Sequence, residues 1–304
     1  MKPAGLSLFF LLGPLFGQAP SVVTSVGYST PQAVAVAPGQ IVTLFAHTKT
    51  KLAQPIVAGG DTLPATLGGF SVSRAATFST VAIPMPILSV APVETCAAVV
   101  PVICIGSTAI TVQIPFELVP NVERSRLPEN FATLTISDNG DSGEPIALHP
   151  VSDRIHILNS CDAALNPQSG PCRPVFLHAD GSLVSWDNPA AAGESLTVQA
   201  YGLGYADSQV ATGSPSPSPA LSVSGVSMDY RYGADAVVTR PGAQAGTLSA
   251  QLVPGSVGLY QLTFVAPAMP DGAGECSATA NNLTVVIGRG ASYDGAALCV
   301  QNRQ

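Results

Sequence analysis

The stretch that decides the fold is Ala37-Pro38-Gly39-Gln40-Ile41-Val42-Thr43-Leu44-Phe45-Ala46. A Pro-Gly pair predicts a tight turn, because Pro presets one backbone angle and Gly adopts angles that other residues resist. The β-branched and apolar run that follows the pair predicts a strand, since branched side chains fit the pleated surface of a sheet. The stretch therefore indicates a strand introduced by a turn.

The same pattern returns in the second half of the chain. Residues 37–46 are matched at an offset of 154 by Ala191-Ala192-Gly193-Glu194-Ser195-Leu196-Thr197-Val198-Gln199-Ala200. Two later matches follow in the same order: residues 111–115 return as 263–267 at an offset of 152, and residues 131–136 return as 282–287 at an offset of 151. Three ordered matches at nearly constant spacing indicate an internal repeat.

The repeat predicts two related domains, residues 21–152 and 153–304, each long enough to bury its own core. Short apolar runs bounded by Gly and Pro occur throughout, and no window carries an apolar stripe of helical period. The predicted fold class is all-β, with two tandem β-sandwiches. In residues 213–219, three prolines lack an N–H, which predicts an extended, exposed loop.

Composition excludes several classes of protein. The chain is 46% apolar and 10% charged, whereas a typical globular chain is about 25% charged. That balance argues against disorder, which needs low hydrophobicity and high net charge. Twenty-nine Gly and 27 Pro argue against long helices. The net charge of −7 gives no electrostatic footprint for nucleic acid, so no nucleic-acid partner is predicted.

The N-terminus predicts export. Residues 1–19 have the features of a signal peptide: a positive start at Lys2, an apolar run over residues 6–16, and the small-x-small pattern Gly17-Gln18-Ala19. The apolar run is shorter than the 20 or so residues that span a bilayer, and no later run is long enough. The predicted location is secreted or extracellular, and the mature chain is not expected to span a membrane.

Cysteine usage agrees with export. The six cysteines lie in three local pairs, which are Cys96 with Cys104, Cys161 with Cys172, and Cys276 with Cys299. Six cysteines allow about 15 pairings, and the sequence alone does not choose among them, although two separate domains favour the local set. A zinc site is the weaker alternative, because no Cys-x-x-Cys spacing occurs.

Several motifs together resemble one known family. They are residues 37–45, 63–69, 112–118, 180–190, 201–204 and 253–262. Their content and order are similar to the Ig-like carboxy-terminal domain of many secreted acidobacterial proteins, over about residues 25–301. The resemblance implies an Ig-like sandwich, in two copies, and a secreted protein. It implies no activity, and the chain departs from the family in its extra cysteines and in an insertion around residues 81–104.

Motifs that carry catalysis or hold a cofactor are absent from the sequence. No Gly-x-Ser-x-Gly, His-Glu-x-x-His, P-loop or dinucleotide fingerprint occurs, so neither an enzyme nor a cofactor is predicted. Asp138, Asp141 and Glu144 form an oxygen-rich segment that is a weak calcium candidate. The same segment contains Asn139-Gly140, a strong hairpin signal, and a plain hairpin turn is the favoured interpretation.

Aromatic residues are the candidates for binding. Trp186 is the only Trp and lies in a polar, turn-rich segment, and Tyr230 and Tyr232 alternate along a predicted strand. Such rings combine flat apolar area with a polar edge, so the three residues form a candidate patch for stacking on a sugar or contacting a protein. The predicted function is non-catalytic adhesion, matrix contact or scaffolding outside the cell. The alternative is a carbohydrate-binding accessory module for extracellular polysaccharide.

Overall fold

The computed structural model describes residues 22–24, 34–76, 81–93, 107–118, 132–160, 162, 173–233, 236–242, 248–278 and 280–302. Every regular element in these ranges is a β-strand, which confirms the predicted all-β class. Across the same ranges, no helix has the length and apolar character to cross a membrane. The predicted signal peptide, residues 1–19, lies outside the described residues.

The first half folds as two sheets. One has the order β1 (Val22–Thr24), β3 (Ile41–His47), β9 (Ser107–Gln113), β8 (Ile87–Pro92), β4 (Ile56–Val57). The other has the order β2 (Val34–Val36), β12 (Ile146–Pro150), β10 (Ala132–Asp138), β6 (Phe70–Ala76), β5 (Thr66–Leu67), with β11 (Asp141–Ser142) beside β10 and β7 (Ile83–Pro84) beside β6. Burial alternates along β10, and its inward residues Leu134 and Ile136 belong to the same apolar core as Ile110 of β9.

The second half repeats this arrangement. One sheet has the order β13 (His156–Ile157), β16 (Ser195–Tyr201), β19 (Leu259–Val265), β18 (Leu248–Leu252), with β14 (Phe176–Leu177) also beside β16. The facing strands are β17 (Ser227–Tyr232), β20 (Leu283–Gly288) and β21 (Tyr293–Leu298), while β15 (Ala190–Ala191) pairs with β22 (Val300–Gln301). Phe176 and Phe264 meet edge to face in the core, with ring centroids 5.9 Å apart.

Both halves have the topology of an immunoglobulin-like sandwich. Strands A, B, E and D of that fold form one sheet, and C, F and G form the other. Here the first set is β1, β3, β9, β8 or β13, β16, β19, β18, and the second is β6, β10, β12 or β17, β20, β21. Each half also has a short strand before B that pairs in parallel with a strand at the end of that half. In the first half β2 pairs with β12, and in the second half β15 pairs with β22. The fold class is therefore two tandem Ig-like β-sandwiches.

The quoted turn has the same geometry in both halves. Gly39 and Gly193 have positive φ angles of 73° and 81°. The next side chain then accepts a hydrogen bond from the N–H three residues earlier: Oε1 of Gln40 from Ala37 at 2.9 Å, and Oε2 of Glu194 from Ala191 at 2.8 Å. The matched segments thus lie on strands B, E and F of each sandwich, at equivalent places in the topology.

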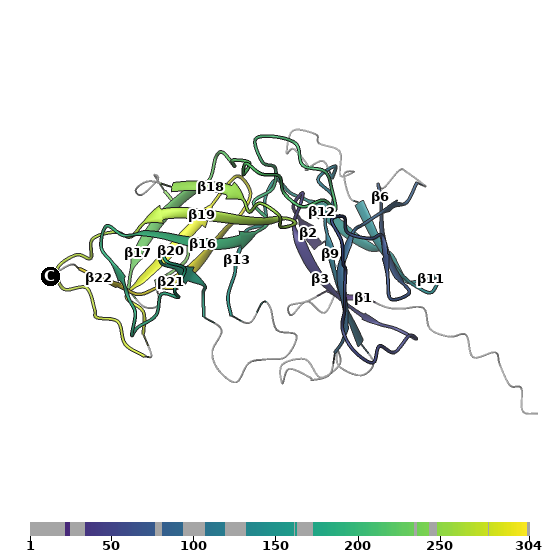
Figure 1. Ribbon diagram of the computed structural model, residues 1–304, viewed down its shortest axis with the longest axis horizontal. Helices are drawn as coiled ribbons and strands as arrows, with labels where there is room; N and C mark the ends of the chain where they lie inside the picture. Colours follow the sequence, from purple (N-terminus) through teal and green to yellow (C-terminus); the bar gives the residue numbers. More distant parts are fainter. Residues whose placement is uncertain are drawn as a thin grey trace, which may run out of the picture.

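The two halves lie end to end, and a loop of the second half reaches the first (Figure 1). Phe116, which follows β9, belongs to the apolar core of the second half. The Gly213 N–H donates to Oε1 of Gln113 at 2.7 Å, and the Gly213 carbonyl accepts from the Leu63 N–H at 2.8 Å. The prediction of an exposed loop over residues 213–219 is wrong for its first part: Gly213 is buried where it bonds the first half, and Ser216 is buried against the turn at Gly255 and Ser256 of its own half.

Candidate functional site

The Trp186 loop, residues 178–189, joins β14 to β15 at the surface of the second sandwich. It begins with a turn in which the His178 N–H donates to the Ser182 carbonyl at 2.9 Å. Inside the turn, Oδ1 of Asp180 accepts from the Ser182 N–H at 2.9 Å and from its hydroxyl at 2.7 Å. These Ser182 bonds, together with the nearby His178, lower the pKa of Asp180. The carboxylate therefore holds the turn together as an anion.

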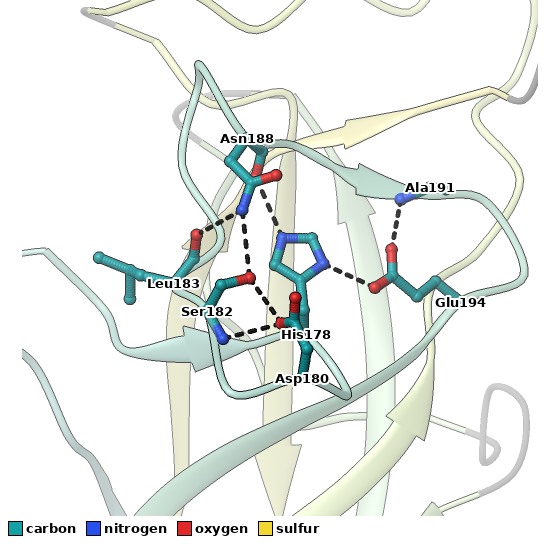
Figure 2. Close-up of polar contacts among 7 residues, drawn as sticks. All are labelled: His178, Asp180, Ser182, Leu183, Asn188, Ala191 and Glu194. Atoms are coloured by element: carbon teal, nitrogen blue, oxygen red, sulfur yellow. Dashed lines mark hydrogen bonds and ion pairs between the residues drawn. The ribbon is translucent and has the colours of Figure 1, made fainter.

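A second set of bonds fixes the tip of the loop. The Ser185 N–H donates to the Asn188 carbonyl at 3.0 Å, and the Asn188 N–H donates back to Oγ of Ser185 at 3.2 Å. Nδ2 of Asn188 donates to the Leu183 carbonyl at 3.2 Å (Figure 2). The four residues 185–188 thus close a turn that carries Trp186.

His178 lies at the centre of the loop, with its ring between Asn188 and Glu194 (Figure 2). Nδ1 is 2.6 Å from Oε1 of Glu194, and Nε2 is 3.2 Å from the Asn188 carbonyl oxygen. Both partners only accept, so both bonds form together only when the ring is the doubly protonated imidazolium. Burial alone lowers the pKa of His178, but the bonds to Glu194 and Asn188 outweigh it and raise the pKa.

Glu194 connects this loop to the turn before β16. One carboxylate oxygen pairs with His178, and the other accepts from the Ala191 N–H. In the first half the equivalent residue is Gln40, whose side chain accepts the turn bond from the Ala37 N–H. The change from amide to carboxylate adds the ion pair that holds the Trp186 loop.

The hydroxyl and the imidazole of this loop are not arranged for nucleophilic catalysis. Oγ of Ser182 donates to Asp180 and accepts from Asn188 at 3.4 Å, whereas the His178 ring faces Glu194 and the Asn188 carbonyl (Figure 2). A nucleophile needs a base within hydrogen-bond reach. The loop also exposes large apolar side chains: Trp186 is 47% exposed and Leu183 is 46% exposed.

The two tyrosines of the candidate patch lie on β17 rather than on the Trp186 loop. Tyr230 packs against the core, with its ring centroid 6.5 Å from that of Phe264 and its hydroxyl donating to the Val265 carbonyl at 2.5 Å. Burial raises the pKa of Tyr230 to about 12. Tyr232 is exposed, and its hydroxyl donates to the Ala268 carbonyl at 3.4 Å. Of the pair, Tyr232 is the more exposed, and Tyr230 is partly buried.

The segment of the calcium candidates forms a hairpin. Asn139 and Gly140, with φ angles of 50° and 91°, connect β10 to β11, as the Asn-Gly pair predicts. Asp138 is buried and accepts from the N–H groups of Lys49 at 2.8 Å and Thr50 at 2.9 Å, and from the Thr50 hydroxyl. Burial alone raises the pKa of Asp138, but these bonds lower it overall.

Of the other two carboxylates of the segment, one forms an ion pair and the other is exposed to solvent. Asp141 pairs with Nζ of Lys49 at 2.8 Å, and Glu144 is exposed. In the part of the chain that the structure describes, no group of three His, Cys, Asp or Glu side chains is placed to hold a metal ion. The carboxylate of Asp138 acts here as an anchor between β10 and the loop after β3.

One predicted cysteine pair is confirmed. Cys276 and Cys299 form a disulfide with their Cα atoms 5.7 Å apart. The bond ties the segment before β20 to the junction between β21 and β22. The other four cysteines, Cys96, Cys104, Cys161 and Cys172, lie outside the described residues.

Sequence reasoning missed the His178–Glu194 pair and the docking of the two halves. The first left a signal: Glu194 takes the turn position held by Gln40, and a histidine precedes an Asp-Gly-Ser turn in the same domain. The second left none, because the contacts of Phe116 and Gly213 join positions about a hundred residues apart. Such pairs have no period or spacing that a single sequence displays.

Comparisons with known proteins do not assign the chain to a family. No protein-family model matches the chain, and the search of curated proteins finds no match. Among solved structures, a titin A168–A169 fragment is 12% identical, covers 94% of this chain and all of its own, and has a TM-score of 0.19. The tandem Ig repeats of Dlar are 9% identical over 94% of this chain and all of their own, also with a TM-score of 0.19. Since these scores are low, the fold assignment rests on the strand topology described above.

Proposed function

We propose that the chain is a secreted, non-catalytic protein of two Ig-like domains that serves in adhesion, matrix contact or scaffolding through its Trp186 loop. The proposed organisation is a signal peptide at residues 1–19 and domains at residues 21–152 and 153–304. The domains are proposed as two copies of the family of secreted acidobacterial proteins that the motifs resemble. A disulfide between Cys276 and Cys299 supports an oxidising compartment.

The observation that carries the proposal is the exposed pair Trp186 and Leu183 on a loop whose backbone is already fixed. Trp is among the residues that most often dominate the energy of an interface. A loop held by the Asp180, Asn188 and His178 bonds loses little conformational freedom on binding, which favours affinity. The docked halves support a scaffolding role, because they hold the loop on one continuous body.

A polysaccharide is the alternative partner. The exposed Trp186 ring is followed by the Asp187 carboxylate, which accepts from the Ser185 hydroxyl at 2.5 Å. An aromatic face beside fixed polar groups is the combination that a sugar ring contacts with its C–H face and its hydroxyls. This reading assigns the same loop to a different ligand.

A pull-down separates the two. The purified mature chain is incubated with a panel of insoluble polysaccharides and with intact bacterial surfaces, beside Trp186→Ala and the control Val57→Ala, whose exposed side chain lies in the first half. Binding to cell surfaces that only Trp186→Ala loses supports adhesion or scaffolding. Depletion by one polysaccharide with the same loss supports the alternative. Binding that Trp186→Ala retains, or no binding at all, contradicts a role for this loop.

A further inference from the structure

A pocket of about 320 Å³ lies where the two halves meet. The first half contributes Phe116 and Glu117 to its wall, and the second contributes Tyr205 and residues 206–210. Both halves contribute to the wall, and most of its residues come from the second half. Its volume is at the small end of ligand sites, which span roughly 300–1,000 Å³.

Hydrogen bonds across the junction fix the first two groups of this wall. The Phe116 N–H donates to Oγ1 of Thr212 at 2.9 Å, and that hydroxyl donates to Oε2 of Glu117 at 2.6 Å. The Tyr205 hydroxyl donates to the Leu118 carbonyl at 3.2 Å. Tyr205, whose hydroxyl is engaged in this way, is a 40% exposed residue and lines the pocket.

The second half also contributes polar side chains to the wall. Asp207 accepts from the Ser224 N–H at 2.9 Å and from its hydroxyl at 2.8 Å. Ser208 and Gln209 stand beside it and bring a hydroxyl and an amide, which both donate and accept. The lining of the pocket therefore includes one tyrosine, two carboxylates and two side chains that both donate and accept hydrogen bonds.

Both carboxylates of the wall already accept hydrogen bonds from the chain. Oε2 of Glu117 accepts from the Thr212 hydroxyl, and the two oxygens of Asp207 accept from Ser224. The Ser224 bonds lower the pKa of Asp207, so its carboxylate stays an acceptor. A neutral ligand with many hydroxyls gains acceptors for its O–H groups, donors for its oxygens, and an aromatic face for its C–H groups.

We propose that this junction pocket binds one neutral sugar ring of a polysaccharide, stacked on Tyr205 and hydrogen-bonded to Glu117 and Asp207. The site is separate from the Trp186 loop and does not rest on the function proposed for that loop. It adds matrix polysaccharide as a ligand that contacts both sandwiches at once.

The test is a titration of the isotope-labelled full mature chain with cellobiose, maltose and lactose, followed by amide NMR shifts. At least one disaccharide is expected to give saturable shifts around residues 116–118 and 205–210. Tyr205→Ala is expected to weaken that binding about tenfold, the effect of losing one ring contact. Tyr293→Ala, a ring of nearly equal exposure at 41%, and Trp186→Ala are expected to leave it unchanged.

A second variant separates binding from folding. Tyr205→Phe keeps the ring and loses only the bond to Leu118, so it is expected to bind within about twofold of the parent chain. The proposal is overturned by an absence of saturable shifts with all three disaccharides, by tighter binding of a lysine methylamide probe than of any sugar, or by loss of binding in Tyr205→Phe. It is also overturned if Trp186→Ala abolishes the shifts and Tyr205→Ala does not.

Discussion

The turn Ala37–Gln40 and its counterpart in the second half make a matched pair for one mutational test. Gly39 and Gly193 occupy equivalent turns with φ angles of 73° and 81°. An Ala at either position enters the left-handed region, which costs an L-residue about 1–2 kcal/mol. The surroundings differ: a Cβ on Gly39 would overlap the Phe116 ring, whereas a Cβ on Gly193 meets nothing within 4 Å.

We therefore predict unequal losses. Gly193→Ala should reduce the free energy of unfolding by about 1–2 kcal/mol, from the backbone angle alone. Gly39→Ala should lose the same amount plus about 1–3 kcal/mol, because the added methyl overpacks a buried ring. Urea denaturation followed by circular dichroism, with the slope of each transition checked for constancy, measures both values.

Phe116 supplies the internal check. Phe116→Ala alone should cost about 3–5 kcal/mol, since the ring lies in the core of the second half. In the Gly39→Ala background it should cost about 1–3 kcal/mol less, because removing the ring also removes the overlap. Equal losses for the two glycine variants, or additive losses for Gly39→Ala with Phe116→Ala, would refute the assigned contact.

Three further outcomes are expected. The folded-state pKa of His178 is raised, so its contribution to stability is present below the unfolded pKa of about 6.5 and is lost as the pH rises through the folded value. The urea midpoint of the parent chain should therefore fall over this pH range, and the midpoint of His178→Gln should not show that fall. Asp138→Ala should cost about 1–3 kcal/mol by leaving three partly buried donors without their acceptor, while Asp141→Ala, which breaks an exposed ion pair, should cost under about 1 kcal/mol; thermal and urea unfolding measure both losses. The double variant Cys276→Ser, Cys299→Ser should lose about 3 kcal/mol, the loop-closure effect for a separation of 23 residues, and a smaller loss than about 1 kcal/mol would count against that account.

Local chemistry explains which features were readable from the sequence. The Pro38-Gly39 turn, the strand after it and the Asn139-Gly140 hairpin depend on residues within a few positions of one another. The Cys276–Cys299 bond joins a pair that lies within one half. In each case the backbone angle, the side-chain period or the short loop is a property of a single segment.

The sequence by itself therefore determined the strands, the turns, the all-β class and the two-part plan. Only the tertiary structure decided that Phe116 enters the core of the other half, that Gly213 docks on Gln113, and that Asp138 anchors a loop. It also decided that Tyr230 packs inward while Trp186 faces solvent. These contacts join residues about 35 to 100 positions apart in the sequence. Such residues meet only when whole sheets pack together, and the local conformational preference of a residue does not specify which distant residue it contacts.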